Sequence, residues 1–72
     1  MKPHRGGFTD WTKQQREPTE EHLGFFLTGR FQGHPTFGNH RGRTSMVVKW
    51  CPAEGWFETL NSRYDLGEEF KV

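Results

Sequence analysis

The sequence has a single cysteine, Cys51, and no long apolar segment. One cysteine cannot form a disulfide within the chain, which indicates a reducing compartment such as a cytoplasm. No stretch approaches the roughly 20 apolar residues that a transmembrane helix needs. The charged start at residues 1–5 is not followed by an apolar stretch, so we expect neither a membrane span nor a secretory signal.

Aliphatic side chains are scarce as well. Hydrophobic residues make up 31% of the 72 residues, and aromatic residues account for about half of that share, at 15%. Large aromatic side chains bury roughly 150–250 Å² each, so a few of them can support a small core. A chain of this length forms one domain at most. We therefore expect a single domain with a largely aromatic core.

Acidic residues are missing from one long segment. Residues 23–53 carry four positive side chains and no Asp or Glu, whereas residues 54–72 carry five acids against two bases. Residues 1–22 hold four of each sign, and the total is only +1. Such a dipolar chain favours a binding protein over an enzyme, because the distribution of charge steers encounters with partners.

Residues 1–22 contain few apolar side chains. Only Met1, Phe8 and Trp11 are strongly apolar there, and Pro18 discourages a helix before it. Such a composition does not bury enough surface to offset the entropy of ordering. We expect a flexible arm, disordered or partly helical, anchored by Phe8 and Trp11. A competing interpretation is that Trp11 folds back onto a sheet.

The pattern changes at Leu23, where apolar residues begin to alternate with others. The alternation predicts strands over residues 23–31, 44–50, 56–60 and 64–66, with Gly29 marking a bulge or bend. Over 44–50 it places Met46, Val48 and Trp50 on one face. Residues 68–72 are predicted to form an acidic tail. The expected fold is mainly β: a small antiparallel sheet, meander or open barrel, of three to four short strands over residues 23–67.

No catalytic or metal-binding signature is present. Structural zinc needs four ligands, usually in closely spaced pairs. The four histidines and Cys51 show no such spacing, so a zinc module is a third and weaker interpretation. We expect no enzyme activity, no cofactor, no metal and no small-molecule substrate. The histidines are His4, His22, His34 and His40.

Basic and aromatic residues are the candidates for partner binding. Arginine and aromatic side chains dominate protein–protein interfaces, and the same pair of chemistries holds single-stranded nucleic acid. At least one of the aromatic residues around the turn at 52–55 is expected to be exposed, because alternation cannot bury all of them on one face. The candidates are Arg30, His40, Arg41, Arg43, Lys49, Trp50, Trp56 and Phe57.

Three stretches occur in an order that resembles small regulatory proteins of tailed phages. These are Gly33–Phe37, with glycine-histidine-proline, Thr44–Val48, with threonine-serine, and Glu58–Gly67, with a tyrosine-leucine-glycine ending. In size and character the chain is similar to the RNA polymerase-binding transcription regulators of lytic Xanthomonas phages. The resemblance covers residues 23–67, and it assigns no contact residue of those proteins to a position in this chain.

The resemblance implies a phage-encoded regulator in the host bacterial cytoplasm. Such a protein binds core subunits of host RNA polymerase, inhibits initiation by displacing sigma factor and promotes antitermination. The alternative from the residues themselves is a small barrel that binds single-stranded nucleic acid through Arg30, Arg41, Arg43 and Lys49. The two hypotheses differ in whether the basic loop contacts the ligand directly.

Overall fold

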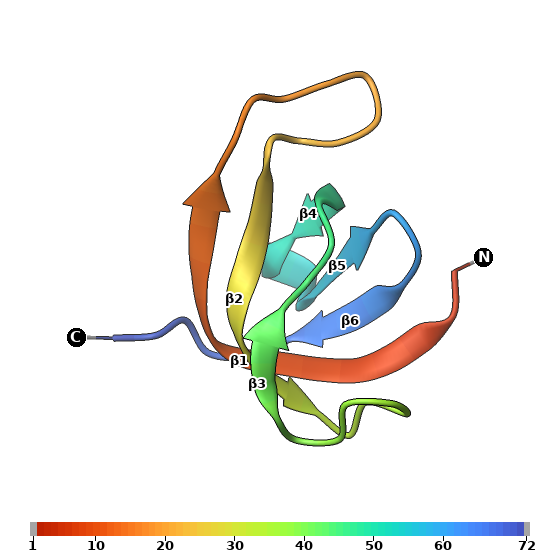
Figure 1. Cartoon of the computed structure of the whole chain (residues 1–72), viewed down its shortest axis with the longest axis vertical. Helices are drawn as coiled ribbons and strands as arrows, with labels where there is room; N and C mark the ends of the chain where they lie inside the picture. The colour runs from red at the N-terminus through yellow and green to blue at the C-terminus, as the bar shows by residue number, and fades with distance from the viewer. Residues whose placement is uncertain (1, 72) are drawn as a thin grey trace.

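The computed structural model describes residues 2–71, and these form one six-stranded sheet without an α-helix (Figure 1). The strands lie side by side in the order β3-β2-β1-β6-β5-β4. The mainly β class is confirmed, but the sheet has six strands instead of three or four. It is also mixed, because β1 and β6 run parallel. The strands are β1 (His4–Gln15), β2 (Phe25–Gln32), β3 (Arg41–Arg43), β4 (Val47–Cys51), β5 (Trp56–Thr59) and β6 (Arg63–Leu66), with a 3-10 turn, η1 (Pro52–Glu54), before β5.

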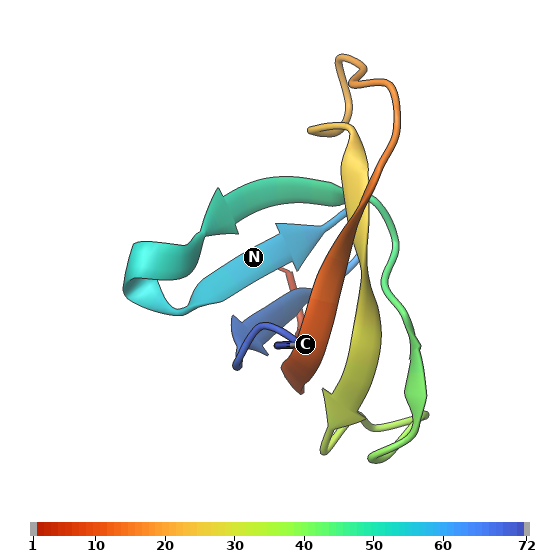
Figure 2. The same cartoon turned by 90° about the vertical axis from the view of Figure 1, so that its left-hand side faces the viewer.

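The sheet is strongly curled, so that β1–β2–β3 and β6–β5–β4 form two layers around the core (Figure 2). Two backbone hydrogen bonds attach β2 and the residues just before it to the chain between β3 and the start of β4. The Leu23 amide donates to the Val47 carbonyl at 2.9 Å, and the Thr44 amide donates to the Leu27 carbonyl at 2.8 Å. The segment between β3 and β4 therefore lies along β2, and the two halves meet there as well as at β1.

The N-terminal region differs most from the sequence expectation. Residues 4–15 are not a flexible arm: they form β1, which is the longest strand and lies in the middle of the sheet between β2 and β6. Phe8 is completely buried and Trp11 is 8% exposed, so both belong to the core. Met1 and Val72, the outer ends of the expected arm and tail, lie outside the described residues.

A bulge bends β1 at Asp10. The pairing with β2 shifts between Thr9 and Thr12, and Asp10 has a positive φ of 52°. Asp tolerates this left-handed region better than most residues. Gly29 lies opposite the bulge, which agrees with the expected irregularity there. The bend lets β1 contribute to both layers of the curled sheet (Figure 1).

The core is predominantly aromatic, as the composition predicted. The Phe57 and Tyr64 rings stack at 5.2 Å between centroids, and the Phe8 and Phe31 rings meet edge to face at 5.0 Å. Such pairs add about 0.5–1.5 kcal/mol beyond the area they bury. The buried hydrophobic residues are Phe8, Trp11, Phe25, Leu27, Phe31, Val47, Phe57 and Tyr64.

The faces of β2 and β5 follow the predicted alternation, whereas β4 does not. The pairing of β4 with β5 is irregular between Val47 and Lys49, so the alternation breaks within the strand. As a result Val47 is buried, and Trp50 lies opposite buried Phe57. The expected grouping of Met46, Val48 and Trp50 on one face is wrong for this reason.

The acidic C-terminal segment is attached to β1. The Trp11 indole Nε1 donates to the Gly67 carbonyl at 2.9 Å, and the Phe70 amide donates to the Trp11 carbonyl at 2.8 Å. Glu69 forms an isolated parallel bridge with Trp11. The expected tail is therefore attached to the sheet over residues 68–70. No helix in residues 2–71 has the length and apolarity that crossing a membrane requires.

Candidate functional site

The pairing of β2 with β3 brings three arginines onto one face of the sheet. Arg30 lies opposite Arg41, and Thr28 lies opposite Arg43. Directly paired residues project their side chains to the same side of a sheet. The structure thus groups three of the four basic residues that the sequence nominated, although β3 itself was expected to be a loop.

Polar side chains from β1 extend this face across a third strand. Thr12 lies opposite Thr28, with their hydroxyl oxygens 2.9 Å apart, and Gln14 lies opposite Phe26. The Gln14 Nε2 is 3.2 Å from the Thr12 hydroxyl and 3.3 Å from the Thr28 hydroxyl. We call this surface the basic face; it comprises Thr12, Gln14, Arg16, Phe26, Thr28, Arg30, Arg41 and Arg43.

Phe26 is the aromatic residue of the basic face. Its side chain is half-buried, and the guanidinium carbon of Arg16 lies 5.0 Å from the centre of its ring. Cation–π contact of this kind holds the arginine over the ring. Sequence analysis did not select Phe26. The signal was available, because Phe26 is the one aromatic residue on the non-core face of the alternating stretch 23–31.

The arginines of the basic face have no carboxylate partner among residues 2–71. The one Lys–carboxylate pair found there is Lys2–Glu58 at 3.7 Å, and Asp65 lies 3.1 Å from the His4 Nε2, both away from this face. Like charges on adjacent strands are destabilising. Three neighbouring arginines without a counter-charge therefore make a surface that an anionic ligand would stabilise.

Lys49 and Trp56 lie on a different surface, the outer side of β4–β5–β6. Lys49 is paired with Glu58, and Glu58 with Arg63, so positive and negative side chains alternate there. The Arg63 guanidinium lies 4.1 Å from the centre of a Trp56 ring. This outer surface is locally compensated in charge, and Lys49 does not join the basic face.

Phe57 belongs to the interior, which corrects its nomination as a partner contact, and Trp50 is half-buried against the core. Phe57 is 0% exposed and cannot meet a partner in the folded protein. Trp50 packs edge to face on Trp11 at 5.2 Å and on Phe25 at 5.3 Å. Lys13 covers this cluster, with its Nζ 4.7 Å from a Trp50 ring centre.

His40 and His34 organise the loop between β2 and β3. The His40 carbonyl accepts a hydrogen bond from the Phe31 amide at 3.0 Å, which places Arg41 directly after it at the start of β3. The buried His34 Nδ1 accepts from the Thr36 and Phe37 amides at 3.0 and 3.1 Å. The loop is thus fixed by hydrogen bonds at its base and at its centre.

Burial lowers the pKa of His34 below its ordinary value, and the positive charge of Arg5 lowers it further. An Nδ1 that accepts two hydrogen bonds carries no proton, so the neutral form fits this loop. Burial also raises the pKa of Tyr64, whose ring stacks on His34 at 6.1 Å.

Within residues 2–71, no three side chains of His, Cys, Asp or Glu come together as ligands of a metal would. Cys51 is half-buried at the end of β4 and forms no disulfide. The basic face therefore offers positive charge, hydrogen-bonding groups and an aromatic ring. No protein-family model, curated protein or solved structure matches this chain.

Proposed function

We propose that this protein binds single-stranded nucleic acid on its basic face. The observation that carries the proposal is the grouping of Arg30, Arg41 and Arg43 on one side of β2 and β3, without carboxylates and beside the half-exposed ring of Phe26. Phosphate contacts supply affinity without regard to sequence, and an aromatic ring supplies stacking to any base.

The shape of the face favours a single strand over a duplex. β3 is an edge strand that is exposed along its whole length, and its two arginines lie on the face of the curled sheet that points away from the core. No helix is available in residues 2–71 to enter a major groove. A single strand can follow such a face with its phosphates on the arginines and its bases free to stack.

The direct test is fluorescence anisotropy with labelled 12-nucleotide RNA and DNA strands at several salt concentrations. Three or four neutralised phosphates correspond to a slope of about −2 to −3 in log affinity against log salt, at about 0.7 per phosphate for single strands. Blunt duplexes of the same length serve as the comparison. Absence of binding at low salt would contradict the proposal.

A matched pair of variants locates the contact. Arg41→Gln and Lys49→Gln each remove one positive charge from an exposed side chain, but only Arg41 lies on the basic face. We expect Arg41→Gln to weaken binding and to reduce the salt slope by about 0.7. Lys49→Gln should leave the slope unchanged. Equal effects from both variants would indicate attraction by net charge alone.

We also propose, as a second candidate, a regulator that binds host RNA polymerase through protein contacts. It rests on the sequence resemblance and on two features of the surface. β3 and β4 are the edges of the sheet, and an edge strand can pair with a strand of a partner. Leu23, Phe37 and Leu60 are large hydrophobic residues that stay exposed, as residues at protein interfaces commonly are.

A pull-down from bacterial lysate, with and without nuclease, separates the two candidates. Core polymerase retained after nuclease, with sigma factor depleted, would support the regulator. The same experiment with the double variant Arg41→Glu, Arg43→Glu tests whether the basic face takes part in that contact. Retention of polymerase by this variant would show that the basic face is peripheral to that contact. Loss of all binding after nuclease would favour the nucleic-acid candidate.

A further inference from the structure

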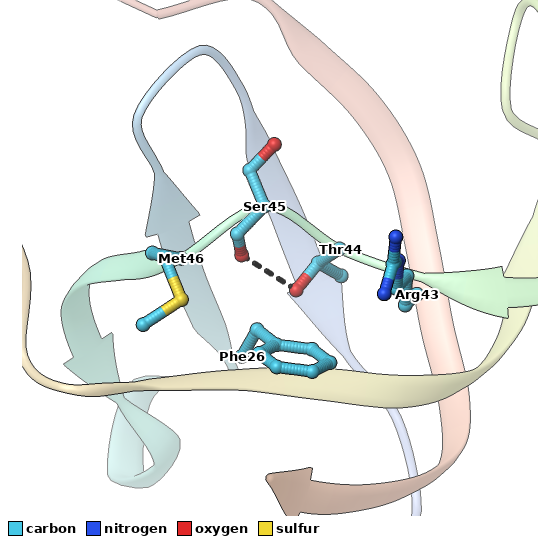
Figure 3. Close-up of a pocket in the computed structure, with 5 residues that line it drawn as sticks. All are labelled: Phe26, Arg43, Thr44, Ser45 and Met46. Atoms are coloured by element: carbon cyan, nitrogen blue, oxygen red, sulfur yellow. Dashed lines mark hydrogen bonds between the residues drawn. The ribbon is translucent and has the colours of Figure 1, made fainter. Parts of the chain in front are cut away.

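A small pocket opens at one end of the basic face. Its volume is about 230 Å³, and it is lined by Phe26 from β2 and by Arg43, Thr44, Ser45 and Met46 from the segment that leads from β3 to β4. Figure 3 shows the Phe26 ring beneath this segment, with Met46 and Arg43 on opposite sides of it. The pocket thus combines an aromatic ring, a thioether and one positive charge.

The wall of the pocket is held in place by hydrogen bonds. Buried Thr44 uses its hydroxyl twice: the Oγ1 accepts from the Leu27 amide at 3.1 Å and donates to the Ser45 carbonyl at 2.8 Å. Its amide donates to the Leu27 carbonyl at 2.8 Å. The residues before and after Thr44 are therefore fixed relative to β2, and the pocket is formed before any ligand arrives. A preformed site loses less conformational entropy on binding.

The size and lining of the pocket suit one planar ring system. Sites that enclose drug-sized molecules usually measure roughly 300–1,000 Å³, so this pocket is too small for a whole dinucleotide or large cofactor. Aromatic and thioether groups pack well against flat rings. Arg43 also lines the pocket, and it supplies a positive charge for a phosphate attached to that ring system.

The pocket is continuous with the rest of the basic face. Arg43 lines it and also lies in β3 beside Arg41, with only Gly42 between them. On the β2 side, Phe26 lines the pocket while its ring also carries the Arg16 guanidinium. A ligand with a ring in the pocket and further phosphates along its chain would therefore meet a positive charge on each side.

We propose that this pocket is a base-binding subsite: it takes one unpaired base of a single-stranded nucleic acid, stacked on Phe26, with the adjoining phosphate on Arg43. The proposal rests on the proposed nucleic-acid function and adds to it a place where a base, as opposed to the backbone, is bound. An unpaired base can enter because it is not held in a helical stack.

The experiment compares oligonucleotides that carry the same phosphates but differ in their bases. A single-stranded 12-mer and an abasic 12-mer of equal length are titrated by anisotropy against the wild-type protein at one low salt concentration. We expect the normal strand to bind at least fivefold more tightly, the lower end of what one base–aromatic stack contributes. Equal affinities would overturn the base subsite and leave the proposed function standing.

Two variants assign the preference to the pocket. Phe26→Leu removes the ring and keeps an apolar side chain, while Phe70→Leu makes the same change at an exposed position that does not line the pocket. Phe26→Leu should lose the preference for the normal strand and keep its affinity for the abasic one. Phe70→Leu should keep both, and a preference that survives in Phe26→Leu would place the base elsewhere.

The proposed function and the base subsite can each be disproved separately. If neither oligonucleotide binds at low salt, the proposed function is wrong and the subsite falls with it. If both bind equally, only the subsite is wrong. Circular dichroism and thermal melting of each variant check the fold, and the wild-type comparison decides the question even where a variant does not fold, because it requires no substitution.

Discussion

The backbone of Gly29 passes so close to that of Thr9 that a Cβ on residue 29 would lie 2.6 Å from the Thr9 carbonyl oxygen. The same Cβ would lie 2.9 Å from the carbonyl oxygen of Asp10, at the bulge in β1. Both neighbours are backbone atoms, so they cannot move aside as a flexible side chain can. The pairing of β1 with β2 therefore depends on the absence of a side chain at position 29.

We predict that Gly29→Ala destabilises the fold by about 2 kcal/mol or more, since overpacking of a core typically costs about 1–3 kcal/mol. Gly7→Ala is the matched control, because a Cβ there meets its nearest neighbour at an ordinary 3.4 Å. Urea unfolding followed by tryptophan fluorescence measures both. Equal midpoints for Gly29→Ala and the wild type would contradict the close approach.

β1 gives a second prediction, which separates a core strand from a flexible arm. Phe8→Ala removes a completely buried ring, and such substitutions cost about 3–5 kcal/mol. Native domains are stable by only about 0.05–0.15 kcal/mol per residue, so the variant should lose a large part of its stability. Phe70→Ala, at a residue that is 47% exposed, should change stability by less than 1 kcal/mol, about the range of surface substitutions. Near-ultraviolet circular dichroism reports the outcome. An unchanged spectrum for Phe8→Ala would support the sequence-based prediction of a flexible arm.

The buried hydroxyl of Thr44 makes a third prediction. Thr44→Val keeps the shape of the side chain but leaves the Leu27 amide without its 3.1 Å acceptor. An unsatisfied buried donor costs about 1–3 kcal/mol. Ser45→Ala serves as the control, because its exposed side chain makes no such bond and only its carbonyl accepts from Thr44. Hydrogen exchange at the Leu27 amide should accelerate in Thr44→Val and stay slow in Ser45→Ala.

His34 makes the stability depend on pH. Burial, and then the charge of Arg5, lower its pKa in the folded protein below the ordinary 6.5 of the unfolded chain. The unfolded state therefore binds the proton more readily, so the free energy of unfolding is fully present above pH 6.5 and decreases as the pH falls below it. Protonation at Nδ1 would also displace the amides of Thr36 and Phe37.

The measurement is chemical unfolding of the wild type and of His34→Asn between pH 8 and pH 5. His34→Asn should be the less stable protein at pH 8, because it lacks the ring that packs against Phe31 and Tyr64. It should lose less stability on acidification than the wild type does. Parallel losses in the two proteins would assign the pH dependence to other groups.

The sequence predicts those strands whose pattern is set by burial on one side. β2 and β5 alternate as predicted, and in β2 the expected face is the buried one, whereas buried Phe57 of β5 was nominated as a partner contact. β1 was not predicted, because its two core residues, Phe8 and Trp11, are three residues apart. The bulge at Asp10 adds a residue and breaks the period of two. β3 was not predicted either, because Arg41–Arg43 is an exposed edge strand without an apolar residue that could show an alternating pattern.

The candidate site was predicted in part for a related reason. Arg30, Arg41 and Arg43 are close in the chain, and the hairpin of β2 and β3 keeps them close in space. Lys49 is nearly as close in sequence but belongs to β4, at the other edge of the sheet. Charge along a sequence does not reveal which face of a curled sheet a residue occupies. Phe26 needed the strand register before it could be grouped with the arginines.

The parallel pairing of β1 with β6 has a consequence for how the chain reaches its fold. His4 is paired with Arg63, so the centre of the sheet joins segments from opposite ends of the chain. Contacts at such sequence separation slow folding, because loop closure must precede them. During synthesis β1 leaves the ribosome early and has β2 as a partner, but its other edge stays open until β6 has emerged. The β6-facing edge of β1 therefore cannot be paired before residues 63–66 are made, and an unpaired strand edge is prone to aggregation until then.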